Sequence, residues 1–112
     1  MTIRELVKEL DLTVYSGEKG LDNEITNGYC SDLLSDVMGK SQEGNLWITL
    51  QTHKNVMAVA SLKDLSAILL VNNHKANADT LDASNEEEIP ILGSNKPAFE
   101  LCGVLYELLK NR

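Results

Sequence analysis

Apolar positions along the chain follow two spacings, one typical of helices and one typical of buried strands. Apolar residues recurring every three or four positions predict helices over residues 3–10, 32–38, 56–62, 78–88 and 96–109. Short apolar or β-branched runs predict strands over residues 12–15, 24–30, 46–50, 66–71 and 89–92. Their alternation with short connections predicts an α/β fold, a three-layer sandwich with a mostly parallel sheet flanked by helices. We expect residues 1–112 to form a single domain, because no linker or repeat interrupts the pattern.

Several polar residues mark the expected helix ends. Thr2 and Glu5 have the spacing of a capping box at the first helix. Ser31 is placed to cap the second helix, and Gly39 is placed to end it. Asn55 is placed to cap the third helix.

The charge balance narrows the choice of partners. The chain has 17 acidic and 10 basic residues, a net charge of −7, and an ordinary globular composition with 43% hydrophobic residues. A negative chain lacks the basic face that nucleic acid and anionic membranes attract, so we expect neither partner. The charged start around Arg4 and Glu5 is unlike a signal peptide, and no apolar run approaches the ~18 residues of a membrane span. We therefore expect a cytoplasmic protein.

Motifs for metals, cofactors and nucleotides are absent from the sequence. Cys30 and Cys102 have no ligand spacing, and two thiols are too few for an iron–sulfur cluster, so we expect reduced cysteines. His53 and His74 fit two unrelated polar turns better than a shared metal site. No glycine-rich nucleotide fingerprint occurs. We expect no bound cofactor or metal.

Uncharged polar side chains gather where two predicted strands meet the helices that follow. Such groups donate and accept hydrogen bonds, and ligands of α/β proteins bind outside the carboxyl ends of strands. With the polar turn that follows the fourth strand, they form our candidate ligand site: Ser31, Thr49, Gln51, His53, Asn55, Asn72 and Asn73. Ordinary capping and turn formation explains the same residues about equally well, and the sequence leaves both interpretations open.

A catalytic interpretation is the weaker alternative. His53 is a candidate base for the thiol of Cys30, or a partner for Asp32, in a small hydrolase or transferase. A strand cysteine beside Tyr29 is more typical of a packed thiol than of a nucleophile. We therefore expect no enzymatic activity.

Some ten positions across the two strand–helix junctions form a longer motif. It reads Gly28-Tyr29-x-Ser31-Asp32-Leu33-Leu34-Ser35-x-Val37-Met38, then Trp47-Ile48-Thr49-x-Gln51-x-His53-x-Asn55, then Ala58-Val59-Ala60. Near the end of the chain stand Ile89-Pro90-Ile91-Leu92 and Phe99-Glu100-x-x-Gly103-x-Leu105-Tyr106. From the first helix to Tyr106, the chain resembles the DRTGG domain family.

The resemblance implies an accessory domain. Similar domains occur beside CBS domains in regulated inorganic pyrophosphatases and in some phosphotransacetylases, and the fold resembles the N-terminal domain of HPr kinase. Stand-alone versions are typically bacterial or archaeal. The resemblance implies a non-catalytic regulatory module, homodimeric, that binds a small anionic or nucleotide-like metabolite. A structural protein–protein interaction subunit is the alternative.

One turn departs from the family pattern. Asn72-Asn73-His74 stands where a Thr-Gly-Gly-like turn is expected. Asparagine adopts left-handed backbone conformations more readily than most residues, so we expect the turn shape to be kept.

Overall fold

The computed structural model describes residues 1–111, which form five helices and one five-stranded sheet. The helices are α1 (Ile3–Leu10), α2 (Leu34–Lys40), α3 (Asn55–Leu62), α4 (Ala78–Glu87) and α5 (Ala98–Lys110). The strands are β1 (Thr13–Ser16), β2 (Asn27–Cys30), β3 (Asn45–Thr49), β4 (Ala67–Leu70) and β5 (Ile91–Gly93). A 3-10 helix, η1 (Glu18–Gly20), follows β1. No helix in this part of the chain is long and apolar enough to cross a membrane.

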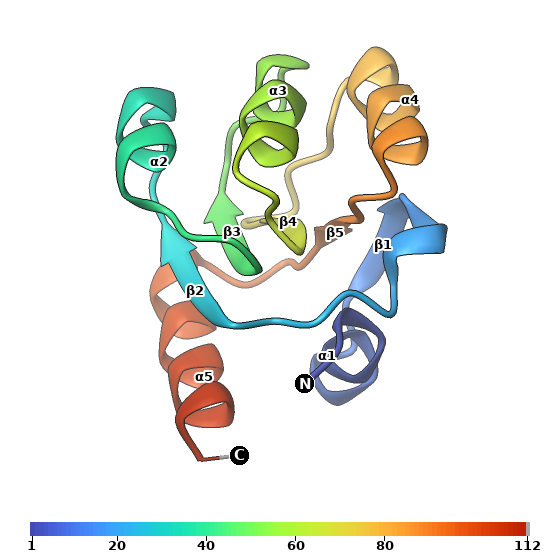
Figure 1. The fold of residues 1–112 in the computed structure, drawn as a ribbon. Coiled ribbons are helices and arrows are strands. Elements are labelled where there is room, and N and C mark those ends of the chain that lie inside the picture. Colours follow the sequence, from blue (N-terminus) through green and yellow to red (C-terminus); the bar gives the residue numbers. More distant parts are fainter. Residues whose placement is uncertain (112) are drawn as a thin grey trace.

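The strands lie in the order β1-β5-β4-β3-β2, so the sheet is mostly parallel. Strands β2 to β5 pair in sequence order and in parallel, while β1 pairs antiparallel with β5. Helices α2, α3 and α4 lie on one face of the sheet, and α1 and α5 lie on the other (Figure 1). The predicted three-layer α/β architecture is confirmed.

Each face of the sheet has its own apolar core. On the three-helix face, Trp47 and Ile68 pack with residues of α2 and α3. On the two-helix face, Leu69 and Leu92 pack with residues of α1 and α5. Strand β4 is buried along its whole length, as its continuous apolar run predicts.

The segment from β1 to β2 joins the two edges of the sheet. It runs beneath the sheet from one edge strand to the other (Figure 1). Backbone N–H groups of Ile3 and Arg4 donate to the carbonyls of Asn23 and Leu21 at 3.0 and 2.7 Å. The start of α1 is thereby fixed to this segment, and the predicted capping box of Thr2 and Glu5 is confirmed there.

Three predicted helix ends are wrong. Helix α2 begins at Leu34 after Leu33 as N-cap, because Ser31 lies too early and its hydroxyl accepts the N–H of Leu33 at 3.2 Å. The same helix continues through Gly39 to Lys40, because Gly39 does not adopt the positive φ with which glycine commonly ends a helix. Asn55 is the first residue of α3 and not its cap, because Lys54 already has helical backbone angles.

Candidate functional site

Asp32 holds together the ends of β2 and β3. One of its carboxylate oxygens accepts the hydroxyl of Thr49 at 2.8 Å and the backbone N–H of Leu50 at 3.0 Å. Its carbonyl accepts the side-chain amide of Gln51 at 2.9 Å. The Thr49 hydroxyl also accepts the backbone N–H of Gln51 at 3.2 Å. Both predicted ligand residues, Thr49 and Gln51, therefore already have hydrogen-bond partners within the protein.

The other predicted residues at these junctions also serve local structure. The Ser31 carbonyl accepts the indole N–H of Trp47 at 2.8 Å, and its hydroxyl accepts a backbone N–H. His53 is exposed, and its Nδ1 accepts the backbone N–H of Asn55 at 3.2 Å. The side chain of Asn55 is exposed at the start of α3.

The groups of the catalytic alternative do not combine. Within residues 1–111, the His53 ring bonds neither Cys30 nor Asp32. Partial burial, a hydrogen bond with Cys102 and the nearby Asp32 raise the pKa of the Cys30 thiol to about 11. A thiol with this pKa is almost fully protonated near neutral pH, whereas the thiolate is the nucleophile.

The ends of β4 and β5 differ from those of β2 and β3 because the chain turns opposite ways after them. After β2, β3 and β4 the chain passes to helices on one face, whereas after β5 it passes to α5 on the other (Figure 1). Such a switch point opens a crevice at the carboxyl edge of an α/β sheet, and ligands bind there. The topology therefore directs attention to the loops after β4 and β5.

The loop after β4 contains the predicted Asn72–Asn73 turn. Both residues have left-handed backbone angles, with φ of 54° and 61°, which asparagine adopts more readily than most residues. Their N–H groups donate to the carbonyls of Lys96 and Ser94 at 2.9 and 2.8 Å. The two loops of the switch point are thus joined by backbone hydrogen bonds. The Asn73 side chain takes no part in joining them.

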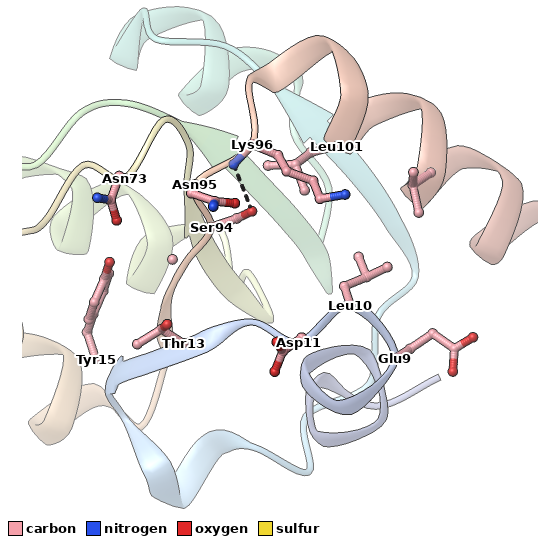
Figure 2. A pocket seen from close by; sticks show the side chains of 12 residues that line it. Glu9, Leu10, Asp11, Thr13, Tyr15, Asn73, Ser94, Asn95, Lys96 and Leu101 are labelled. Atoms are coloured by element: carbon pink, nitrogen blue, oxygen red, sulfur yellow. Dashed lines mark hydrogen bonds between the residues drawn. The ribbon is translucent and has the colours of Figure 1, made fainter.

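A cavity of about 570 Å³ lies beside these loops, between α1 and α5 (Figure 2). Leu10, Leu101 and Val104 form its apolar part. The polar part is formed by residues from β1, from the loops after β4 and β5, and from the end of α1: Glu9, Asp11, Thr13, Tyr15, Asn73, Ser94, Asn95 and Lys96. The volume is within the range of small-molecule sites, and the lining is mostly polar, which favours a polar ligand.

Tyr15 reaches this pocket through an irregularity of β1. The pairing with β5 shifts between Val14 and Ser16, so Tyr15 has no partner residue on β5. Bulges of this kind re-aim side chains and are frequent next to functional sites. The Tyr15 ring lies against Gly93, where an added Cβ would clash with the ring and its hydroxyl. Glycine at this position is what leaves room for Tyr15.

Most polar side chains of the pocket have no hydrogen-bond partner among residues 1–111. Within residues 1–111, the side chains of Thr13, Tyr15, Asn73 and Asn95 make no hydrogen bond. In Figure 2, Tyr15 and Asn73 lie at one end of the lining and Glu9 lies at the other. The pocket therefore offers several free hydrogen-bonding groups, in contrast to the junction around Asp32.

Charges of both signs border the pocket. The Nζ atom of Lys96 lies 4.0 Å from Oε2 of Glu100 in an exposed ion pair at the start of α5. Glu9 and Asp11 contribute carboxylates from the end of α1. No group of three or more His, Cys, Asp or Glu side chains in the described chain is arranged to hold a metal ion.

Of the seven predicted ligand residues, Asn73 lines this pocket and the other six do not. Sequence reasoning missed Thr13, Tyr15 and Asn95. The Gly93-Ser94-Asn95 turn was a possible signal, since polar turns after strands are where binding residues gather. Nothing in the sequence places β1 beside β5, so Thr13 and Tyr15 had no such signal.

Comparison with known structures identifies the class of domain. The chain superimposes on the regulatory region of a Clostridium perfringens pyrophosphatase, composed of CBS and DRTGG domains and solved with its activator diadenosine tetraphosphate. The TM-score is 0.65 at 10% sequence identity, covering 93% of this chain and 45% of that one. The fold is that of a DRTGG-like domain, so the resemblance seen in the sequence is confirmed.

Sequence comparison gives a second, more distant relation. The HPr kinase/phosphorylases of Lacticaseibacillus casei and Lacticaseibacillus paracasei are each 25% identical to this chain over 134 aligned positions. The alignment covers all of this chain but only 40% of each relative. A scan of known protein-family models gives no match.

Proposed function

We propose that residues 1–112 form one DRTGG-like domain, a non-catalytic regulatory module that binds a small polar ligand in the cavity between α1 and α5. The observation that carries this proposal is a 570 Å³ cavity at the switch point of the sheet, lined in part by Thr13, Tyr15, Asn73 and Asn95, whose side chains make no hydrogen bond within residues 1–111. We propose a cytoplasmic location for this acidic domain.

The ligand that fits best is a small metabolite with an anionic group and a ring or polar body. The ammonium group of Lys96 favours an anion at one side of the cavity. The Tyr15 ring and the amides of Asn73 and Asn95 suit a nucleotide-like or other polar body. Glu9 and Asp11 disfavour a ligand that is negative along its whole length.

A regulatory role agrees with the comparisons. The structural neighbour is a regulatory region solved with a nucleotide activator. This chain corresponds to a minor part of the HPr kinase/phosphorylases, so their catalytic activity does not transfer with the similarity. The protonated Cys30 and the isolated His53 also favour a module without catalysis.

We further propose that the module is a homodimer. Its second candidate role is that of a structural interaction subunit, and the observation favouring this role is Phe99 on α5, which is 90% exposed. Tyr106 on the same helix is 60% exposed, and large apolar side chains that are exposed together are typical of a contact surface.

Calorimetry and thermal-shift measurements against diadenosine tetraphosphate, ATP, inorganic phosphate and free amino acids test the ligand site. We expect one class to bind and to raise the melting temperature. Tyr15→Phe and Asn95→Ala should each weaken binding roughly tenfold, because each removes a hydrogen-bonding group.

Asn55→Ala is the matched control, since it removes an exposed asparagine from the originally predicted set. Loss of binding in Asn55→Ala, with normal binding in Asn95→Ala, would place the ligand at the ends of β2 and β3 instead. No binding by any of these classes would reject the ligand-binding role and leave the interaction role.

A further inference from the structure

The two cysteines of the chain lie side by side, although they are far apart in the sequence. Cys30 ends β2, and Cys102 stands in the first half of α5. Both are free thiols, and a hydrogen bond joins them. Both also line one small cavity, of about 130 Å³, between β2 and α5. The shared cavity and the hydrogen bond together place the two sulfur atoms close to each other.

The surroundings of the two thiols leave room for the sulfur atoms to move. Ile48, Leu105 and Leu109 form the apolar part of the cavity lining, and every residue that lines it is uncharged. A disulfide holds its sulfur atoms about 2 Å apart, closer than any hydrogen bond, so both side chains must rotate to form one. The cavity supplies the space for this rotation, which a close-packed core would not.

The pair is also accessible from solvent. Cys30 is exposed and Cys102 is half-buried, so a small reagent can reach them from the open side of the cavity. Cysteines that only fill a core are enclosed and inert, whereas reactive ones are partly exposed. The position of this pair is that of reactive cysteines.

The two thiols are not equivalent. Partial burial and the hydrogen bond with Cys102 raise the pKa of the Cys30 thiol to about 11. In a coupled pair of thiols, one ionises first and the other keeps its proton, which it donates to the sulfur anion. Cys30 is the thiol that keeps its proton, so Cys102 supplies the thiolate. The thiolate is the nucleophile in disulfide exchange, which makes Cys102 the attacking thiol and Cys30 the resolving thiol.

We propose that Cys30 and Cys102 form a redox modification site, at which a small disulfide such as oxidised glutathione converts the two thiols into a disulfide that joins β2 to α5. Disulfides of cytosolic proteins are usually transient and redox-sensing, and this one is reversed by an excess of small thiols. The inference goes beyond the ligand-binding role and does not depend on it.

The exchange takes place in two steps. The Cys102 thiolate attacks one sulfur atom of the small disulfide, forms a mixed disulfide and releases a thiolate. Cys30 then gives its proton to the released thiolate and attacks the sulfur of Cys102, which forms the Cys30–Cys102 bond and releases the second thiolate. The second thiolate takes up the proton that Cys102 lost. Two cysteine thiols are thereby oxidised, and one small disulfide is reduced to two small thiols.

The bond fixes α5 to the edge of the sheet. Strand β2 is an edge strand that pairs only with β3. The bond closes a loop of roughly 70 residues in the unfolded chain, which disfavours the unfolded state. Leu101 and Val104 on α5 also line the cavity between α1 and α5, so oxidation fixes one wall of that cavity as well.

Equilibration of the full chain with mixtures of reduced and oxidised glutathione at about pH 8 tests the proposal. Free thiols are then blocked with iodoacetamide, and mass spectrometry of peptides identifies the bonded cysteines. We expect a Cys30–Cys102 bond within single chains. The oxidised form should melt roughly 10 °C higher than the reduced form, and hydrogen exchange in α5 should be slower.

Two variants separate the roles of the thiols. Cys30→Ser should accumulate the mixed disulfide with glutathione on Cys102, because the resolving thiol is missing. Cys102→Ser should form its mixed disulfide roughly fivefold more slowly, because burial still favours the protonated form of Cys30. The rise in melting temperature on oxidation should be absent from both variants.

The parent chain unfolded in urea is the control for a chance encounter of the two thiols. Its equilibrium constant for forming the Cys30–Cys102 bond from oxidised glutathione should be at least about a hundredfold lower than that of the folded chain.

A folded chain that stays reduced in excess oxidised glutathione would overturn the modification site. Glutathione attached to both cysteines, with no bond between them, would do the same. So would a bond that forms equally well in the unfolded chain or that lowers the melting temperature. Faster formation of the mixed disulfide in Cys102→Ser than in Cys30→Ser would overturn the assignment of the attacking and resolving thiols.

Discussion

The two halves of the sheet's carboxyl edge use similar residues in different ways. At the ends of β2 and β3, Asp32 binds Thr49, Leu50 and Gln51, and the polar groups have partners within the chain. At the ends of β4 and β5, the backbones of the two loops bond each other and leave side chains such as Asn73 and Asn95 free.

The difference follows from the path of the chain. After β2 and β3 the chain passes to the same face of the sheet, so neighbouring loops pack together and their polar groups satisfy one another. After β4 and β5 the chain passes to opposite faces, and a cavity lies beside the two loops, between α1 and α5. Polar residues at strand ends are therefore better candidates for a ligand site where the chain leaves neighbouring strands toward opposite faces.

The largest expected effect is on the stability of the Asp32 junction. Asp32→Ala removes the acceptor of a buried hydroxyl and of a backbone N–H, so we expect a loss of about 2 kcal/mol in the free energy of unfolding. Urea denaturation followed by circular dichroism measures this loss. Asp82→Ala, at an exposed carboxylate on α4, is the control and should be nearly neutral.

If Asp32→Ala kept full stability but abolished ligand binding, the ends of β2 and β3 would form the ligand site rather than a structural junction.

A smaller effect is expected at Gly93, on the other half. Gly93→Ala should displace the Tyr15 ring, costing about 1 kcal/mol of stability and reducing ligand binding. Thermal denaturation and calorimetry on the same samples separate the two effects. In Gly28→Ala the added Cβ lies 3.9 Å from the Leu46 carbonyl oxygen, an ordinary contact, so this strand glycine is the control. Unchanged ligand binding in Gly93→Ala would show that the position of the Tyr15 ring does not matter for binding.

The smallest effect concerns reactivity rather than stability. With a pKa of about 11, the Cys30 thiol should be alkylated slowly at pH 7, and the rate should rise through pH 9 and 10 to half of its plateau near pH 11. Iodoacetamide labelling followed by mass spectrometry measures this profile.

Cys102→Ser changes the hydrogen-bond partner of Cys30 and serves as the comparison, with its plateau expected at lower pH. Because the folded protein holds this thiol protonated, its contribution to stability is complete below the ordinary thiol pKa and is lost as pH rises through about 11. Rapid labelling of Cys30 in the parent chain at pH 7 would instead indicate a thiolate and support the catalytic interpretation.

The sequence was sufficient for the layers and for most elements. The apolar run through β4 indicated a buried central strand, and Thr2 with Glu5 indicated the start of α1. Ser31 and Asn55 misled because serine and asparagine before an apolar stripe look like caps, whereas here Asp32 fixes an extended link between β2 and α2. Long-range partners of this kind leave no local signal.

The candidate site was harder to predict for the same reason. Asn73 was identified because a polar turn after a buried strand is a local feature. Thr13 and Tyr15 join it only through the antiparallel pairing of β1 with β5 and the bulge at Tyr15. Strand order and bulges depend on contacts between distant parts of the chain. These contacts cannot be predicted from helical or strand periodicity.

The path from β1 to β2 beneath the sheet also bears on the order of folding. Strands β2 to β5 are neighbours both in space and along the chain, so each pairing closes a short loop. Pairing of Thr13 with Gly93 closes a loop of roughly 80 residues, at a greater entropic cost. β1 is thus expected to join last, and the α1–α5 cavity exists only once it has joined. A ligand in that cavity would select the fully assembled sheet and strengthen its most costly strand pairing.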